Sequence, residues 1–68
     1  MKPQTSAVLR LLRERGSLSP REARELVGTD RLAARILEIR KALGRRCVCT
    51  IRERNRNGGS HARYVWMD

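Results

Sequence analysis

The chain has 68 residues, with sixteen basic side chains against seven acidic ones and a formal net charge of +9. A chain of this length has room for one domain with one small core, which excludes a second domain, a deep substrate cavity and a large cofactor fold. Hydrophobic residues make up 40% of the chain and fall in periodic blocks, which excludes a disordered tail. We therefore expect a single domain over residues 1–68.

The sign of the charge favours polyanionic partners. A small domain of charge +9 attracts nucleic acid first, and an anionic membrane surface or an acidic protein second. Most of the basic residues are arginine, whose planar guanidinium suits phosphates and guanine edges. A GC-rich genome also favours arginine over lysine, but it does not explain the excess of positive charge. Arg10 and Arg13 interrupt the first apolar run, so we expect no signal peptide or membrane span and a cytoplasmic location.

The first predicted helix covers residues 3–15. Val8, Leu11 and Leu12 fall on one helical face, and Gly16 ends the helix. Its start has three candidates, which are a cap at Thr5 or Ser6 and a first turn at Pro3.

The second predicted helix follows a short link at residues 17–18. Ser19 is the expected cap, Pro20 the first helical residue, and Glu22 completes a capping box. The helix ends at Val27 because Gly28 breaks it. Its predicted inner face consists of Ala23, Leu26 and Val27.

A third helix is predicted over residues 31–43. Thr29 and Asp30 are its expected caps, and Gly44 closes it. Apolar residues recur with helical spacing and predict an inner stripe of Leu32, Ile36, Ile39 and Leu43. Residues 30–46 also carry the largest local excess of positive charge, +4 from six basic and two acidic residues.

A β-hairpin is predicted after Gly44, where the pattern becomes alternating. Residues 47–51 form the first strand, residues 54–60 a turn with an Asn-Gly signal, and residues 62–67 the second strand. Tyr64 and Trp66 are expected to close the core against Ile51 and the first helix.

Two helices joined by a tight glycine-containing turn are typical of a helix-turn-helix, and a following hairpin makes it a winged helix. The expected fold is therefore mainly α, a winged helix-turn-helix of three helices followed by a two-stranded wing. In this arrangement the third helix enters the major groove of double-stranded DNA, and the basic wing lies along the backbone or in the minor groove.

Four residues of the third helix are predicted to meet base edges. Arg31 and Arg35 are four apart on its expected exposed face, where their repulsion is relieved by a polyanion. Ala34 allows close approach or touches a thymine methyl group. Glu38 either accepts a hydrogen bond from cytosine or pairs with Arg35 or Lys41. The alternative interpretation is that these residues only form the solvent-exposed face of the helix and do not contact DNA.

Phosphate contacts are expected from helix ends and from the wing. The amides near Ser19 and Thr29 lie at helix starts, which bind phosphates. Arg40 lies nearer the core and reaches either the hairpin or a phosphate. The remaining contacts are expected from Lys41, Arg45, Arg46, Arg54, Arg56 and Arg63. Alternatively, Arg45 and Arg46 neutralise the helix dipole, and the wing arginines serve only solubility.

Cysteine and histidine residues give little support for catalysis. Cys47 and Cys49 lie on one side of one strand, where a mutual disulfide is disfavoured and small buried hydrophobes are expected. A zinc site needs about four ligands, and only His61 is left to add. We therefore expect no enzyme, no metal and no cofactor.

Three stretches resemble a family of small winged helix-turn-helix proteins of bacteriophages and prophages. They are Ser-Leu-Ser-Pro-Arg-Glu-Ala at residues 17–23, Arg-Leu-Ala-Ala-Arg-Ile at 31–36 continuing to Ile39-Arg40, and Gly58-Gly59 with Ala62-Arg63-Tyr64. The resemblance covers nearly the whole chain and implies a phage-encoded DNA-binding domain. The two cysteines and Trp66 depart from the family pattern.

The expected function is a double-stranded DNA-binding protein that acts as a phage transcriptional regulator, with pairing on DNA as a homodimer or a cooperative assembly. An excisionase-like or architectural DNA-bending factor is the alternative. A different class is a protein-interaction module that inhibits a host protein through an acidic face, for which the first helix would carry the contact. RNA is a weaker candidate because no stacking platform is visible.

Overall fold

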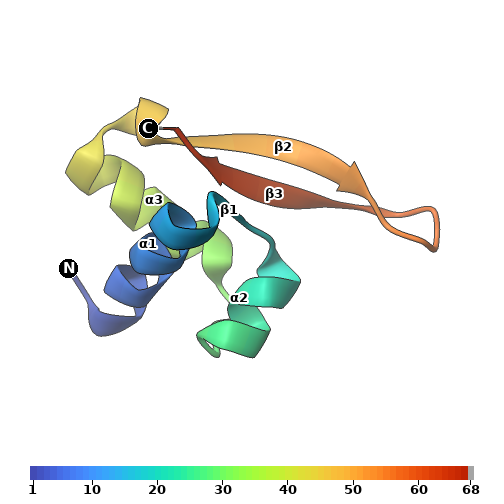
Figure 1. The fold of residues 1–68 in the computed structure, drawn as a ribbon, viewed down its shortest axis with the longest axis horizontal. Helices are drawn as coiled ribbons and strands as arrows, with labels where there is room; N and C mark the ends of the chain where they lie inside the picture. The colour runs from blue at the N-terminus through green and yellow to red at the C-terminus, as the bar shows by residue number, and fades with distance from the viewer. Residues whose placement is uncertain (68) are drawn as a thin grey trace.

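The computed structural model describes residues 1–67 and confirms the predicted order of three helices followed by a hairpin (Figure 1). The elements are α1 (Pro3–Arg15), β1 (Ser17–Leu18), α2 (Pro20–Leu26), α3 (Leu32–Leu43), the 3₁₀ turn η1 (Arg45–Cys47), β2 (Val48–Arg54) and β3 (Ser60–Trp66). None of the helices within residues 1–67 has the length and apolar character that crossing a membrane requires.

Local sequence signals set the ends of the first two helices. Pro3 occupies the first turn of α1, and Gly16 ends that helix at φ +83°, where its N–H donates to the Leu12 carbonyl. The predicted capping box of α2 is confirmed. The Ser19 hydroxyl accepts from the Glu22 N–H at 3.2 Å, and the Glu22 carboxylate accepts from the Ser19 N–H at 2.9 Å.

The start of α3 differs from the prediction by one residue. The helix begins at Leu32, and Arg31 occupies the N-cap position without a side-chain cap. The Thr29 hydroxyl instead accepts from the Arg31 N–H at 3.2 Å. Thr29 therefore orders the turn between α2 and α3 and does not cap α3 itself.

The sheet has three antiparallel strands in the order β1–β3–β2. Residues 17–18, predicted as a link, form strand β1, which pairs Ser17 with Val65 and Leu18 with Tyr64. The β2–β3 hairpin continues this sheet, and its far half extends past the helices as a wing (Figure 1). The wing turn covers residues 55–59. Only Gly58 there has a positive φ, so the turn is not the two-residue type I′ turn, which needs two such residues.

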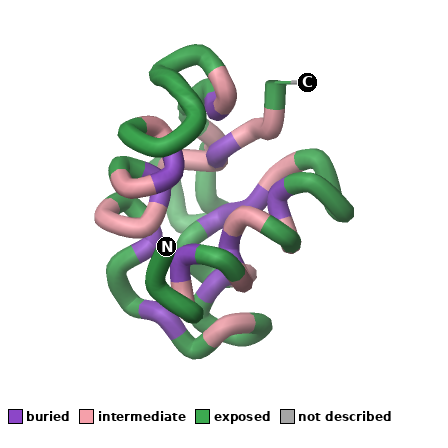
Figure 2. Tube along the Cα trace, turned by 90° about the vertical axis from the view of Figure 1, so that its left-hand side faces the viewer, coloured by how far each residue is buried: buried purple, intermediate pink, exposed green. Residues whose placement is uncertain are grey.

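The core lies between the helices and the inner face of the sheet, and Figure 2 marks its buried positions in purple. Its buried members are Val8, Leu12, Leu18, Ala23, Leu32, Ile36, Ile39, Val48 and Tyr64. Trp66 is half-buried against this core, and the Arg13 guanidinium lies 6.0 Å from its ring centroid.

Several predicted core positions are exposed. Leu26 and Leu43 are the last residues of their helices, where the neighbouring turn that would cover them is missing, and each is 52% exposed. The strand register explains two further errors. Thr50 is paired with the buried Tyr64, so Cys49 and Ile51 project from the opposite face of the sheet, where both are exposed.

Candidate nucleic-acid interface

Every acidic side chain within residues 1–67 has a basic partner. The ion pairs are Arg10–Glu14, Arg15–Glu22, Arg21–Glu25, Arg24–Asp30, Arg35–Glu38 and Arg63–Glu53, with N···O distances from 2.7 to 3.4 Å. Local neutralisation of these charges leaves the excess positive charge on the remaining basic residues.

The basic residues that have no acidic partner within residues 1–67 are concentrated in one part of the chain. They are Arg13, Arg31, Arg40, Lys41, Arg45, Arg46, Arg52, Arg54 and Arg56. All except Arg13 lie between the start of α3 and the wing turn. Glu53 is the acid of this segment that lies nearest the wing turn. Its side chain is on the face of the hairpin opposite to the unpaired arginines of β2, and there it is paired with Arg63. The segment from α3 to the wing is therefore the strongly cationic part of the molecule.

The outer face of α3 carries one small residue, one large apolar residue and one lysine. Ala33, Leu37 and Lys41 are exposed and follow one another at intervals of four residues, so they form a single stripe along the helix. Leu37, in the middle of the helix, is 54% exposed. The opposite side of the helix is buried in the core.

One edge of α3 is attached to the start of β2 through Arg40. Its Nη2 donates to the Val48 carbonyl at 2.8 Å and to the Thr50 hydroxyl at 2.9 Å. This contact confirms the predicted reach of Arg40 toward the hairpin. Because Thr50 and Arg52 are on the same face of β2, the cationic surface passes from the helix onto the strand.

The other edge of α3 is attached to α1, and here the expected exposure of Arg35 is wrong. Its side chain is only 16% exposed, and its guanidinium donates to the Gln4 side chain at 3.1 Å and to Glu38 at 3.0 Å. Glu38 also accepts from the Thr5 hydroxyl and lies 3.7 Å from the Lys2 ammonium. The Thr5 hydrogen bond is the main cause that lowers the pKa of Glu38. The alternative pairing of Glu38 with Arg35 is confirmed.

Among the other residues predicted to contact DNA, some are exposed and others are buried with their hydrogen bonds made inside the protein. Arg31 is exposed at the start of α3, and Ala34 is half-buried. The residues exposed as expected are Lys41, Arg45, Arg46, Arg54 and Arg56. Ser19 and Thr29 are buried, and their hydroxyl oxygens accept hydrogen bonds within their own turns, so neither side chain is exposed to a phosphate.

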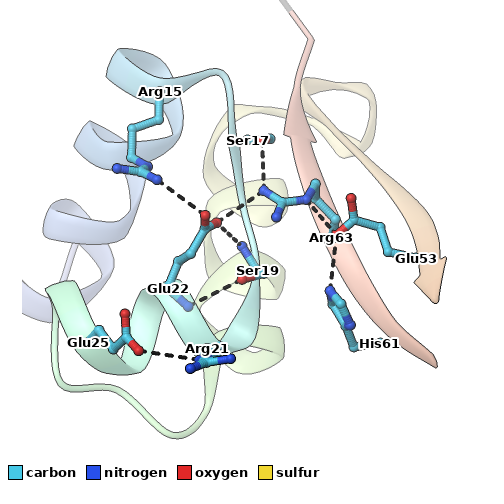
Figure 3. Close-up of polar contacts among 9 residues, drawn as sticks. All are labelled: Arg15, Ser17, Ser19, Arg21, Glu22, Glu25, Glu53, His61 and Arg63. Carbon is cyan, nitrogen blue, oxygen red and sulfur yellow. Dashed lines mark hydrogen bonds and ion pairs between the residues drawn. The ribbon is translucent and has the colours of Figure 1, made fainter. Parts of the chain in front are cut away.

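Arg63 connects the strands to α2, so it is not the free phosphate ligand that was expected (Figure 3). Its Nε donates to Glu53 at 2.7 Å, and its Nη1 donates to Ser17 and to Glu22, each at 3.0 Å. The side chain is 23% exposed. The bond to Glu53 raises the pKa of Arg63 and lowers the pKa of Glu53. The pKa of Glu22 is lowered first by the Ser19 N–H.

His61 extends this network to the wing turn. Its Nε2 lies 3.0 Å from the Glu53 carboxylate, and its Nδ1 contacts the Asn55 side chain. The turn is therefore connected to the sheet and to α2 through side chains as well as through the strands. No group of three or more His, Cys, Asp or Glu residues within the described chain is placed to hold a metal ion.

Sequence reasoning missed two residues of this surface. Leu37 falls outside the apolar inner stripe of α3, so the helical periodicity alone places it on the outer side of the helix. Arg52 lies two residues before Arg54, which places both on one face of β2. Arg52 donates to the Ser60 hydroxyl across the hairpin at 3.1 Å and has no acidic partner among residues 1–67.

Residues 3–68 match the model of a protein family described as a winged helix-turn-helix domain. No curated protein and no solved structure matches the chain. The family match extends over nearly the whole chain and agrees with the three helices and the wing of the structure. The chain therefore belongs to the winged helix-turn-helix domain family, whose fold is typical of non-catalytic DNA-binding modules.

Proposed function

We propose that the chain binds double-stranded DNA, with α3 in the major groove and the wing on the backbone or in the minor groove. The observation that carries this proposal is the separation of charge. The acids within residues 1–67 are neutralised by neighbouring bases, while the unpaired bases collect on α3, η1, β2 and the wing turn. A polyanion is the partner that such a surface attracts.

The exposed lysine of α3 and the exposed arginines of η1, β2 and the wing turn are assigned to phosphates. They are Lys41, Arg45, Arg46, Arg52, Arg54 and Arg56. Arg31 and Ala34 retain their proposed place near base edges at the start of α3. Arg35 and Glu38 hold α3 against α1 and act as positioning residues. The helix starts near Ser19 and Thr29 are proposed to offer phosphates only those backbone amides that are not already bonded within these turns.

The salt dependence of the DNA affinity tests this proposal, and a variant of the wing tests whether the wing contributes to it. The affinity for a duplex of about 20 base pairs, followed by fluorescence anisotropy, is expected to fall steeply as salt rises, with a log–log slope of roughly −0.9 per phosphate contact. The double variant Arg54→Ala/Arg56→Ala is expected to make the slope shallower by about 2.

The matched control is Arg10→Ala/Arg21→Ala, which removes two exposed arginines of α1 and α2 that already have acidic partners. This control is expected to bind like the parent protein. Binding that does not respond to salt, or an equal loss in the two double variants, would contradict the proposed surface.

We further propose that the DNA-binding activity serves transcriptional regulation, in a phage or prophage and in the bacterial cytoplasm, in line with the family resemblance of residues 31–36. A DNA-bending role is the second candidate, and the reach of the wing beyond the helices favours it (Figure 1). Circular-permutation gel shifts separate the two roles, because only a bending factor changes mobility with the position of its site. Cooperative binding would support pairing on DNA.

A further inference from the structure

Leu37 occupies an unusual position among the exposed apolar side chains. Large exposed apolar residues within residues 1–67 are Met1, Leu26, Leu37, Leu43, Ile51 and Met67. Leu26 and Leu43 end their helices, whereas Leu37 lies in the middle of α3. It stands one helical turn after Ala33 and one turn before Lys41, on the face opposite the core.

Both edges of α3 hold their charged side chains away from this face. On one side, Arg40 is bonded to the Val48 carbonyl and the Thr50 hydroxyl of β2. On the other side, Arg35 and Glu38 are bonded to each other and to α1. The part of α3 that projects farthest from the core is therefore apolar at its centre.

We propose that Leu37 contacts thymine methyl groups, so that the preferred duplex carries A·T pairs beneath the middle of α3. This inference rests on the proposed DNA-binding function and specifies its target. Thymine is the base that presents a methyl group in the major groove, and apolar side chains recognise that group by contact. The neighbouring Ala33 is small enough for the helix to approach the bases closely.

Charge complementarity favours DNA over a second copy of the chain as the occupant of this face. Leu37 lies between Arg31 and Lys41 along the helix, with Arg52 and Arg54 on the adjoining strand. A second copy would bring the same unpaired cations together, whereas a duplex would place phosphates beside them on both sides of the groove.

Replacement of thymine by deoxyuridine tests the proposal, because it removes the methyl group and keeps the pairing and the phosphates. The probes are two duplexes of about 20 base pairs with the same mixed A·T sequence, one with thymine and one with deoxyuridine throughout. The parent protein is expected to bind the thymine duplex about fourfold more tightly for each methyl group it covers, the factor that burial of one such group supplies. Leu37→Ala is expected to bind the two duplexes equally.

The matched control is Leu26→Ala, which removes an equally exposed leucine from α2 and is expected to keep the preference for thymine. Leu37→Gln keeps the side-chain length, and it too is expected to bind the two duplexes equally.

A parent protein that binds both duplexes equally and in a salt-sensitive way would overturn this inference and leave DNA binding intact. Failure to bind either duplex at low salt would overturn the proposed function itself. Sedimentation that shows a dimer of the parent protein and a monomer of Leu37→Ala would assign the face to a second copy and overturn the inference.

Discussion

At the scale of single residues, Arg63 is the side chain that connects most elements of the sheet region. It bonds to Ser17 of β1, Glu53 of β2 and Glu22 of α2 from its own place on β3. Its removal takes three hydrogen bonds from the network and leaves Glu53 without its arginine, while Glu22 keeps only Arg15. This loss is costly because hydrogen bonds to charged groups are stronger than neutral ones.

We therefore expect Arg63→Ala to lower the free energy of unfolding by about 2 kcal/mol. Urea denaturation followed by circular dichroism measures the change. The control is Arg21→Ala, in which an 88% exposed arginine loses an i,i+4 pair, and there the expected loss is below about 0.5 kcal/mol. Equal losses in the two variants would show that Arg63 does not stabilise the fold through this network.

The residue scale is also where sequence reasoning failed most for the site. Arg35 was expected on the outer face because its spacing from Arg31 is helical, but its burial depends on Gln4 in a different helix. Arg63 was expected to contact a phosphate because it lies in a basic hairpin, but its three partners in the protein come from three other elements. Contacts between distant parts of the chain leave no local pattern that would reveal them.

At the scale of elements, the predictions succeeded where the signal is local. The Ser-Pro-Arg-Glu start of α2 contains both partners of its capping box within four residues, and Gly16 ends α1 through its own backbone conformation. Strand β1 was missed because two residues are too few to show alternation. The outward direction of Ile51 follows from pairing of Thr50 with Tyr64, a register that the sequence of β2 alone does not contain.

Contacts between the elements also hold the hairpin in a fixed position relative to α3. Arg40 connects α3 to β2, and the network of Arg63, Glu53 and His61 connects the hairpin to α2 and toward the wing turn. A groove-binding helix and a backbone-binding wing require a fixed relative position, since a duplex presents its phosphates at fixed spacing.

At the scale of the whole molecule, three carboxylates make stability depend on pH. The pKa of Glu22 is lowered mainly by the Ser19 N–H, that of Glu38 by the Thr5 hydroxyl, and that of Glu53 by Arg63. A carboxylate whose pKa is lower in the folded state than its ordinary value of 4.5 stabilises the fold above that value. This stabilisation is lost as the pH falls through the lower folded-state pKa.

We therefore expect the urea midpoint to stay level from neutral pH down to about pH 5 and to fall as the pH drops below about 4.5. Rising positive charge acts in the same direction, so the parent protein is compared with Glu53→Gln. The variant is expected to be less stable at neutral pH and to lose less stability on acidification. A midpoint that is the same at about pH 3 and pH 7, or an equal acid loss in both proteins, would contradict the role of these carboxylates.

The unpaired positive charges lie on one surface that extends from α3 to the wing. We therefore propose that this surface binds DNA. Titration of the ¹⁵N-labelled protein with a duplex of about 20 base pairs, followed by amide chemical shifts, locates the contact directly. We predict that the largest shifts fall on residues 33–41 of α3, on η1 and on residues 52–58, with little change near Ser6 and Arg10 on the outer face of α1. Shifts that gather on α1, or no shifts at low salt, would contradict the proposed DNA surface.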